Sequence, residues 1–230
     1  MGIFDVFKGK PVTPAQRKQN SINKIRTQGI VYNPHLPMVE SSADVKLKSL
    51  DEICQRAIAS LLAIQLACDI AQGGDYQKSK KFFWELIERY GVQDKLLYKE
   101  RKLFEGGYTQ QDAIDVSCTY ECYWSLIWAL GLIGNIEQAS ETCDCDKAVK
   151  IVSSSVTYED FKNKCKLRDT EKILDMIDLY YRYHWACVEK RIRPEVPIGN
   201  LDPGVVMERR RGLEWLISEE EDWNDIWLDT

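Results

Sequence analysis

Hydrophobic and polar positions follow helical spacing over most of the chain, and start and stop signals divide that pattern into segments. Ser49 and Glu52 have the spacing of a capping box, in which the serine hydroxyl accepts from a backbone amide and the glutamate reaches back to the cap. The apolar run of residues 53–71 keeps this spacing until Gly73 and Gly74, which are typical stop residues. The pattern therefore predicts a helix between Ser49 and Gly73.

Three more helices are predicted in the first half of the chain. Residues 76–91 and 93–107 carry helical spacing and end at glycine. Thr109 with Asp112 then opens a long helix over residues 110–134, whose later half is apolar almost all round. A helix of that composition is expected at the centre of the fold.

The second half contains further cap signals and little strand character. The first cap is Thr157 with Asp160, and the second is either Asp169 or Thr170. The third is Asp202, which Pro203 follows. Residues 148–157 alone have the β-branched density of a strand, and they lack clean alternation. We therefore predict an all-α fold, a single compact multi-helix domain of about seven helices.

The N-terminal segment differs from this body. Residues 1–42 are expected to form a basic, amphipathic arm that ends in an extended, proline-bearing connector over residues 31–42, and the helical domain then covers residues 43–230. Apolar side chains among the basic residues of the arm suggest weak surface attachment through residues 1–10.

Composition narrows the class of protein. An apolar share of 44% supports a real core, and a net charge of −5 lacks the positive field that nucleic-acid binding requires. No apolar run reaches the length of a transmembrane span, and the first residues do not have the pattern of a secretory signal. We therefore expect a cytoplasmic location, where the eight cysteines stay reduced.

His184 is the first candidate for chemistry. At about 100° per residue it falls on an apolar stripe, whereas Asp178 and Arg182 lie on the opposite face at the spacing of an ion pair. The stripe contains Ile173, Ile177, Tyr180, His184, Cys187 and Val188. Two interpretations stay open: a buried neutral imidazole, or a general base.

Glu121 is the second candidate. It is the one charged residue between Ser117 and Gly134, and a carboxylate in an apolar helix needs a cation or a raised pKa. Its candidate partners are Arg168, Arg182, His184 and Arg209. A structural buried pair and an acid/base role both fit this pattern.

Metal and cofactor sites are not expected. Cys143 and Cys145, with Cys118 and Cys122, could supply four thiolates to zinc, but their spacing is unusual and buried free thiols explain them better. There is no Gly-rich phosphate loop or nucleophile elbow. We predict no metal and no cofactor.

Segments of the second half resemble an uncharacterised bacterial family, the domain of unknown function 4272. The similar segments are residues 120–131, 178–186, 201–210 and 222–230, and the likeness covers most of residues 30–230. It implies that Glu121, Arg168, Asp178, Arg182, His184, Asp202, Glu208, Arg209 and Asp229 belong to the family pattern. Such a polar set in a helical domain suggests an internal charge network or a pocket.

Two functions follow as expectations. The first is a binding module without catalysis, whose partner is a protein or a small molecule and not nucleic acid. Its candidate ligand-binding residues are Arg168, Asp178, Arg182, Glu208 and Arg209. The alternative is a hydrolase that uses Glu121 and His184 as acid and base, with an arginine holding an anionic group.

The C-terminal residues are expected to dock on the body. Trp223, Ile226 and Trp227 have the spacing of a buried helical face. Docking would bring Asp229 or the terminal carboxylate to a basic residue, with Arg168, Arg182 and Arg209 as the candidates.

Overall fold

The computed structural model describes residues 12–230, and the regular elements of that range are all helices, with no strand. The all-α prediction is confirmed. The α-helices are α1 Pro14–Thr27, α2 Leu50–Ala71, α3 Tyr76–Tyr90, α4 Tyr98–Glu105, α5 Gln110–Cys118, α6 Tyr120–Ala129, α7 Cys145–Ser153, α8 Tyr158–Lys162, α9 Thr170–Ile192 and α10 Pro203–Trp215. Two short 3-10 turns are η2 Gln93–Lys95 and η3 Trp223–Asp225.

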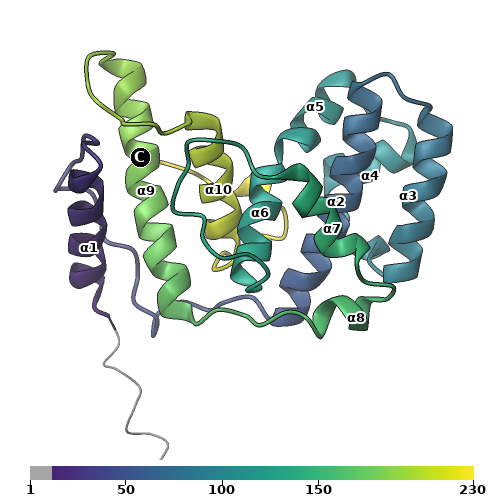
Figure 1. The fold of residues 1–230 in the computed structure, drawn as a ribbon, viewed down its shortest axis with the longest axis horizontal. Helices are drawn as coiled ribbons and strands as arrows, with labels where there is room; N and C mark the ends of the chain where they lie inside the picture. Colours follow the sequence, from purple (N-terminus) through teal and green to yellow (C-terminus); the bar gives the residue numbers. More distant parts are fainter. Residues whose placement is uncertain (1–11) are drawn as a thin grey trace, which may run out of the picture.

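The helices form a row of packed neighbours across the molecule (Figure 1). At one end, α1 lies against α9, and α9 lies against α10. Helix α10 packs on α6, and α6 packs on α2. At the other end, α3, α4 and α5 surround α2, which also contacts α7 and α8.

Most of the predicted helix starts are correct. The hydroxyls of Ser49, Thr109 and Thr157 each accept from the amide three residues on, and each helix has its capping box. Asp169, not Thr170, caps α9, and Asp202 caps α10 ahead of Pro203. These starts could be predicted because a cap involves residues only two or three positions apart.

The prediction of one long helix over residues 110–134 is wrong. The segment is interrupted at Thr119 and forms two helices, α5 and α6. The Thr119 amide bonds to the carbonyl of Val116, three residues back, at 3.1 Å, which is the pattern of a tightened last turn. The Thr119 hydroxyl donates to the same carbonyl at 2.7 Å. Helix α6 then ends at Ala129, before Gly131.

The helix predicted over residues 93–107 is also divided, into η2 and α4. Glu100 accepts from the Leu97 amide at 2.9 Å, so α4 begins at Tyr98. The same carboxylate binds Arg56 of α2 at 2.6 Å. The start of α4 is therefore set by a buried ion pair with a distant helix.

Two further helices were not predicted. Residues 14–27, within the expected arm, form α1, and part of the β-branched stretch at 148–157 lies in α7. Together with the division at Thr119, these two helices explain why residues 12–230 contain ten α-helices where about seven helices are predicted. The expected attachment through residues 1–10 lies outside the described residues.

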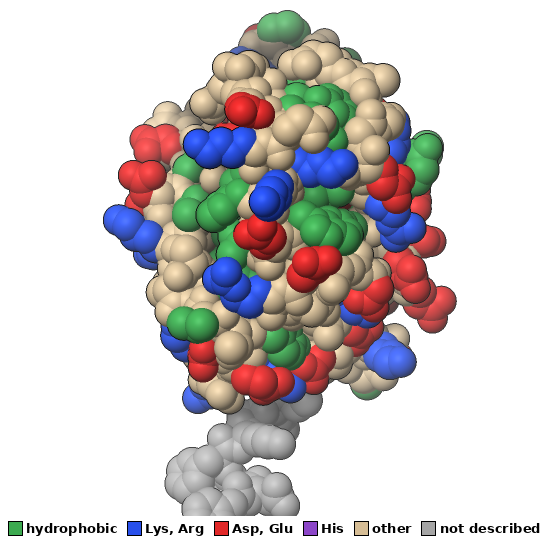
Figure 2. All heavy atoms as spheres, turned by 90° about the vertical axis from the view of Figure 1, so that its right-hand side faces the viewer, with side chains coloured by type: hydrophobic (Ala, Val, Ile, Leu, Met, Phe, Trp, Pro, Cys, Tyr) green, Lys and Arg blue, Asp and Glu red, His purple; other side chains and the backbone are tan. Residues whose placement is uncertain are grey.

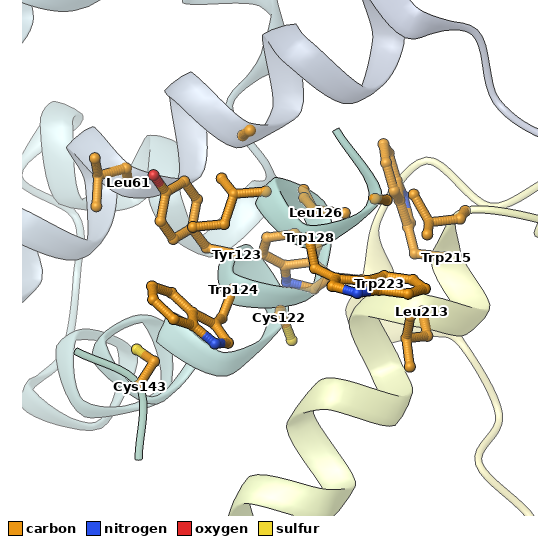
Figure 3. Packing of buried hydrophobic residues seen from close by; sticks show 14 of the residues in the cluster. Leu61, Cys122, Tyr123, Trp124, Leu126, Trp128, Cys143, Leu213, Trp215 and Trp223 are labelled. Atoms are coloured by element: carbon orange, nitrogen blue, oxygen red, sulfur yellow. The ribbon is translucent and has the colours of Figure 1, made fainter. Parts of the chain in front are cut away.

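The core is centred on α2 and α6. Figure 3 shows side chains of α2, α6, α10 and the C-terminal segment meeting there, among them Leu61, Tyr123, Trp215 and Trp223. Within residues 12–230, α2 is long and apolar enough to cross a membrane by length and composition alone. However, 72% of its most apolar window is buried inside the fold, and core helices of this kind pass the same test.

The C-terminal segment docks through one tryptophan only. Trp223 is 1% exposed, whereas Trp227 is 85% exposed. The predicted helical face is wrong because the segment forms a single 3-10 turn, after which the backbone is extended. The basic residue that binds the C-terminal segment is also not one of the three predicted arginines. It is Arg210, which donates to the Asp229 backbone carbonyl oxygen at 2.9 Å.

Candidate functional site

Close packing of α6 and α10 brings Glu121 and Arg209 together. Gly212 of α10 lies so near Cys122 of α6 that a Cβ there would be 2.6 Å from its carbonyl oxygen, and only glycine permits this approach. The Glu121 carboxylate is 2.7 Å from Nε of Arg209, and both residues are buried. Arg209 is thus the partner of Glu121 among the four candidates.

The remaining contacts of this pair hold the loop between α6 and α7. Glu121 accepts from the Cys143 amide at 2.5 Å. Arg209 donates to the carbonyl oxygens of Gln138 and Glu141 at 2.6 and 3.2 Å. These bonds use both carboxylate oxygens and fasten a segment without helix or strand to the core.

Asp178 and Arg182 form a second buried pair, as their spacing predicts. Two nitrogens of Arg182 donate to the Asp178 carboxylate at 2.9 and 2.7 Å, and both side chains are at most 1% exposed. Arg182 also donates to the Pro37 carbonyl oxygen at 3.3 Å. Arg182 therefore ties the connector to α9 at Pro37, while Arg17 of α1 pairs with Glu171 and Asp175 on the same helix.

His184 belongs to a different group of contacts. Nδ1 of His184 is 2.8 Å from Nη1 of Arg210. Because a guanidinium only donates, Nδ1 accepts, and the ring is the neutral Nε2–H tautomer. Burial, together with the charges of Arg210, Arg191 and Arg211, lowers the pKa of His184 to about 4.

The proposed acid and base therefore have separate partners. Within residues 12–230, the side-chain hydrogen bonds of Glu121 go to Cys143 and Arg209, and that of His184 goes to Arg210. Glu208 accepts from the Cys122 thiol at 3.2 Å and pairs with Arg211 at 3.3 Å. Burial and the Glu208 charge raise the pKa of that thiol well above its usual value.

Arg168 lies at the edge of a cavity. Its Nε donates to the Trp128 carbonyl oxygen at 2.7 Å, and its Nη2 donates to those of Ile133 and Gly134 at 2.8 and 3.1 Å. Its guanidinium also stacks over the Trp128 ring, 4.9 Å from the centroid. These contacts involve neutral groups, and no carboxylate of residues 12–230 lies within salt-bridge distance of Arg168.

The cavity lies between α1, α9 and the loop after α6, and has a volume of about 620 Å³. We call it the α1–α9 cleft. It is lined by Arg17, Asn20, Ser21, Lys24, Trp128, Gly134, Asn135, Glu137, Arg168, Lys172, Asp175, Met176 and Leu179.

The cleft has an excess of positive charge, with four cationic side chains and two carboxylates among its lining residues. Arg17 is paired with Glu171 at 2.5 Å and with Asp175 at 3.0 Å, and Lys24 is paired with Glu137. Lys172 is paired more loosely, at 3.8 Å from Asp169. Arg168 is therefore the lining cation without a carboxylate partner among residues 12–230.

Sequence reasoning found Arg168 but missed the other cations of the cleft. Arg17 and Lys24 lie on α1, in the segment for which the sequence predicts an arm without a helix. The missed signal was the capping box of Thr13 and Gln16, with Pro14 at the first helical position. Lys172 was missed because nothing local shows that α1 covers this part of α9.

Among residues 12–230, no group of three or more His, Cys, Asp or Glu side chains is placed to hold a metal ion. Cys122 and Cys143 are buried, while Cys118 and Cys145 are exposed.

Together these features define an all-helical protein whose distant segments are joined by buried arginine pairs and whose α1–α9 cleft carries excess positive charge. The model of the family described as "Domain of unknown function (DUF4272)" matches residues 17–226, so the chain belongs to that family. The resemblance seen in the sequence is confirmed, and the match begins at Arg17 of α1. Neither the curated proteins nor the solved structures gave a match.

Proposed function

We propose that the protein is a binding module without catalysis, and that its ligand is a small anionic molecule held in the α1–α9 cleft. The observation that carries this proposal is the position of Arg168. It lines the cleft, and no carboxylate of residues 12–230 lies within salt-bridge distance of it. A cation in a concave site without a counter-ion favours an anionic ligand.

The other walls of the cleft suggest the shape of that ligand. Lys172 adds a second cation, whereas Met176 and Leu179 supply apolar surface. Asn20 and Asn135 supply neutral hydrogen-bonding groups. A carboxylate or phosphate on a small apolar body matches this combination of side chains.

The absence of catalysis in this proposal is supported by the contacts of the expected acid and base. Glu121 is buried and already bonded through both oxygens, and Arg210 keeps His184 neutral. Acid/base catalysis would need both groups within reach of one substrate, directly or through a water. The hydrolase alternative therefore has less support than binding.

We prefer a small ligand to a protein partner. Figure 2 shows the face on the α3 side of the molecule, where hydrophobic side chains are interrupted by charged ones. Phe82 and Tyr98 are exposed, at 55% and 71%. Scattered apolar groups of this kind are ordinary on protein surfaces, whereas docking sites have contiguous apolar patches.

A cytoplasmic location is part of the proposal. It is supported by the eight cysteines, all of which are free thiols. The net charge of −5 supports a partner other than nucleic acid.

The test uses phenyl phosphate as the anionic probe and benzyl alcohol as a neutral compound with the same ring. Phenyl phosphate at about 100 times its Kd should stabilise the fold by about 2.7 kcal/mol. For a chain of this size that corresponds to a rise in Tm of roughly 5–10 °C. Benzyl alcohol should leave Tm unchanged.

Lys172→Gln should weaken phenyl phosphate binding in calorimetric titrations. Its matched control is Lys166→Gln, which removes an exposed charge nearby that does not line the cleft. Equal affinity in the two variants would contradict the proposed site. Release of phenol that disappears in Glu121→Gln or His184→Gln would instead favour the hydrolase.

A further inference from the structure

A cavity separate from the α1–α9 cleft lies between residues 40–48, which lead to α2, and residues 214–219 at the end of α10. We call it the acidic groove. It has a volume of about 710 Å³ and shares no lining residue with the cleft. The Lys48 amide donates to the Leu216 carbonyl oxygen at 2.8 Å, which joins its two walls.

The acidic groove has an excess of negative charge, because five carboxylates and two lysines line it. One of the carboxylates, Glu214, is paired with Arg210 at 3.3 Å. Four form no salt bridge with any residue of 12–230, and these are Glu40, Asp44, Glu52 and Glu219. Of the lysines, Lys48 donates to the Glu220 carbonyl oxygen at 3.1 Å. The unpaired carboxylates therefore favour a cationic occupant.

The walls of the acidic groove are also partly apolar. The aliphatic residues that line it are Val45, Leu47, Ile217 and Ile226. All four are half-buried and pack against the core, so part of their apolar surface remains open to the groove. A good occupant therefore carries apolar side chains as well as positive charge.

The first residues of the chain have this composition. Residues 1–11 lie outside the described residues, and they contain two lysines, Lys8 and Lys10, against one aspartate. Their bulky apolar side chains include Ile3, Phe4, Val6 and Phe7. The segment thus complements the acidic groove both in charge and in apolar character.

The described chain begins close to the acidic groove. Helix α1 starts at the edge of the molecule along which residues 40–48 run to α2 (Figure 1). In its first turn, Arg17 donates to the Glu40 carbonyl oxygen at 3.0 Å, and Glu40 lines the groove.

The segment is also long enough to follow the groove. An extended chain spans at most about 3.5 Å per residue, so Phe7 can reach about 17 Å from Val12 and Ile3 about 30 Å. Residues 40–48 span at most about 28 Å by the same measure. Residues 3–10 can therefore lie along the whole of this wall.

We propose that residues 3–10 of this chain occupy the acidic groove, with Phe4 and Phe7 against its aliphatic walls and Lys8 and Lys10 beside its unpaired carboxylates. The segment of the same chain is favoured over that of a second copy, because a short tether gives an effective concentration of about 1 mM. Occupation of the groove withholds the apolar side chains of the segment from a membrane surface. The proposal does not depend on an anion in the α1–α9 cleft.

The first experiment cross-links amines to carboxylates with a carbodiimide, in an equal mixture of unlabelled and ¹⁵N-labelled full-length protein. Mass spectrometry should find Lys8 or Lys10 joined to Glu40, Asp44 or Glu219, with both peptides carrying the same isotope. Pairs of mixed isotope would place the segment in the groove of a second copy and overturn the proposal. A map without links from these lysines to the groove would also overturn it.

The second experiment measures hydrogen exchange in the full-length protein and in Phe7→Ser. Exchange at residues 43–48 should become about tenfold faster in the variant, because the docked segment no longer covers that wall. The control is Phe82→Ser, which removes the same side chain from an exposed position on α3 and should leave this exchange unchanged.

Equal exchange at residues 43–48 in the wild type and Phe7→Ser would contradict docking in the groove. In that case, sedimentation of the wild type with vesicles of phosphatidylcholine and phosphatidylglycerol would assign the segment to surface attachment instead.

Discussion

At the scale of single residues, buried arginines join segments that are distant in sequence. Arg17, Arg56, Arg182, Arg209 and Arg210 are all at most 3% exposed. Each has a carboxylate partner, and each also donates to a backbone carbonyl oxygen. In the same order, those carbonyls belong to Glu40, Lys95, Pro37, Gln138 and Asp229. In Arg56–Glu100, Arg182–Asp178 and Arg209–Glu121 the carboxylate is buried as well. Removing one partner from such a pair typically costs about 3–5 kcal/mol, because the other charge stays buried.

The sequence predicted part of this pattern. Asp178 and Arg182 could be paired from their spacing within one helix, and they are. Glu121 was expected to need a cation, but its partner could not be chosen, because Arg209 reaches it only through the close crossing of two helices at Gly212. Such a crossing depends on tertiary packing and leaves no local signal.

His184 gives a prediction for pH dependence. Burial and the neighbouring arginines lower its pKa to about 4 in the folded protein, from an ordinary value of 6.5. Between these values the unfolded chain binds a proton that the folded protein does not, so stability is lost as pH falls from about 6.5 towards about 4. Above this window both states are neutral and the effect vanishes.

The measurement is Tm at several pH values for the wild type and His184→Gln, whose amide can still accept from Arg210. As pH falls from about 6.5 towards about 4, the Tm of the wild type should fall further than that of His184→Gln. His35→Gln, at the exposed second histidine, is the control and should follow the wild type. Parallel curves for all three proteins would show that His184 does not titrate as its contacts indicate.

At the scale of helices, local signals predicted the starts well and the interruptions poorly. Each cap at Ser49, Thr109 and Thr157 is a capping box formed by two residues three positions apart, so it can be recognised in the sequence. The break at Thr119 has no glycine or proline to mark it, and both of its halves pack on α2. Tertiary packing there overrides a helical pattern that is continuous in the sequence.

Helix α1 gives a prediction at this scale. Arg17 attaches it to α9 through bonds to Glu171 and Asp175, and it also donates to the Glu40 carbonyl oxygen at 3.0 Å. Arg17→Met should therefore weaken the docking of α1, by roughly 1–3 kcal/mol for the lost charged hydrogen bonds. Hydrogen exchange should become faster in α1 with little change in α2.

The control for α1 is Arg26→Met, which removes an exposed arginine from the same helix. Exchange in α1 should then stay as in the wild type. Equal exchange in both variants would mean that Ile22 and Ile25, which are buried, hold α1 without help from the ion pairs.

At the scale of the whole molecule, both described ends of the chain are tied to the body. The N-terminal side is held by α1 on α9, and the C-terminal side by Trp223 and by the bond from Arg210 to the Asp229 carbonyl oxygen. Apolar spacing predicted that the C-terminal segment docks. It could not show that only the first tryptophan is buried, because the segment turns once and then leaves the helical path.

Trp223 should be the residue on which docking of the C-terminal segment depends. Its ring meets Trp215 edge to face, with centroids 6.3 Å apart, and Arg56 lies 4.9 Å from its centroid. Trp223→Ala should cost roughly 3–5 kcal/mol, as for other large buried aromatic side chains. Since about 1 kcal/mol shifts Tm by about 2–4 °C in a chain of this size, Tm should fall by roughly 6–20 °C.

The control is Trp227→Ala, which removes the same side chain from an exposed position and should leave Tm nearly unchanged. Deletion of residues 223–230 should lower Tm as much as Trp223→Ala does. Equal Tm values for Trp223→Ala and Trp227→Ala would show that the C-terminal segment does not stabilise the fold.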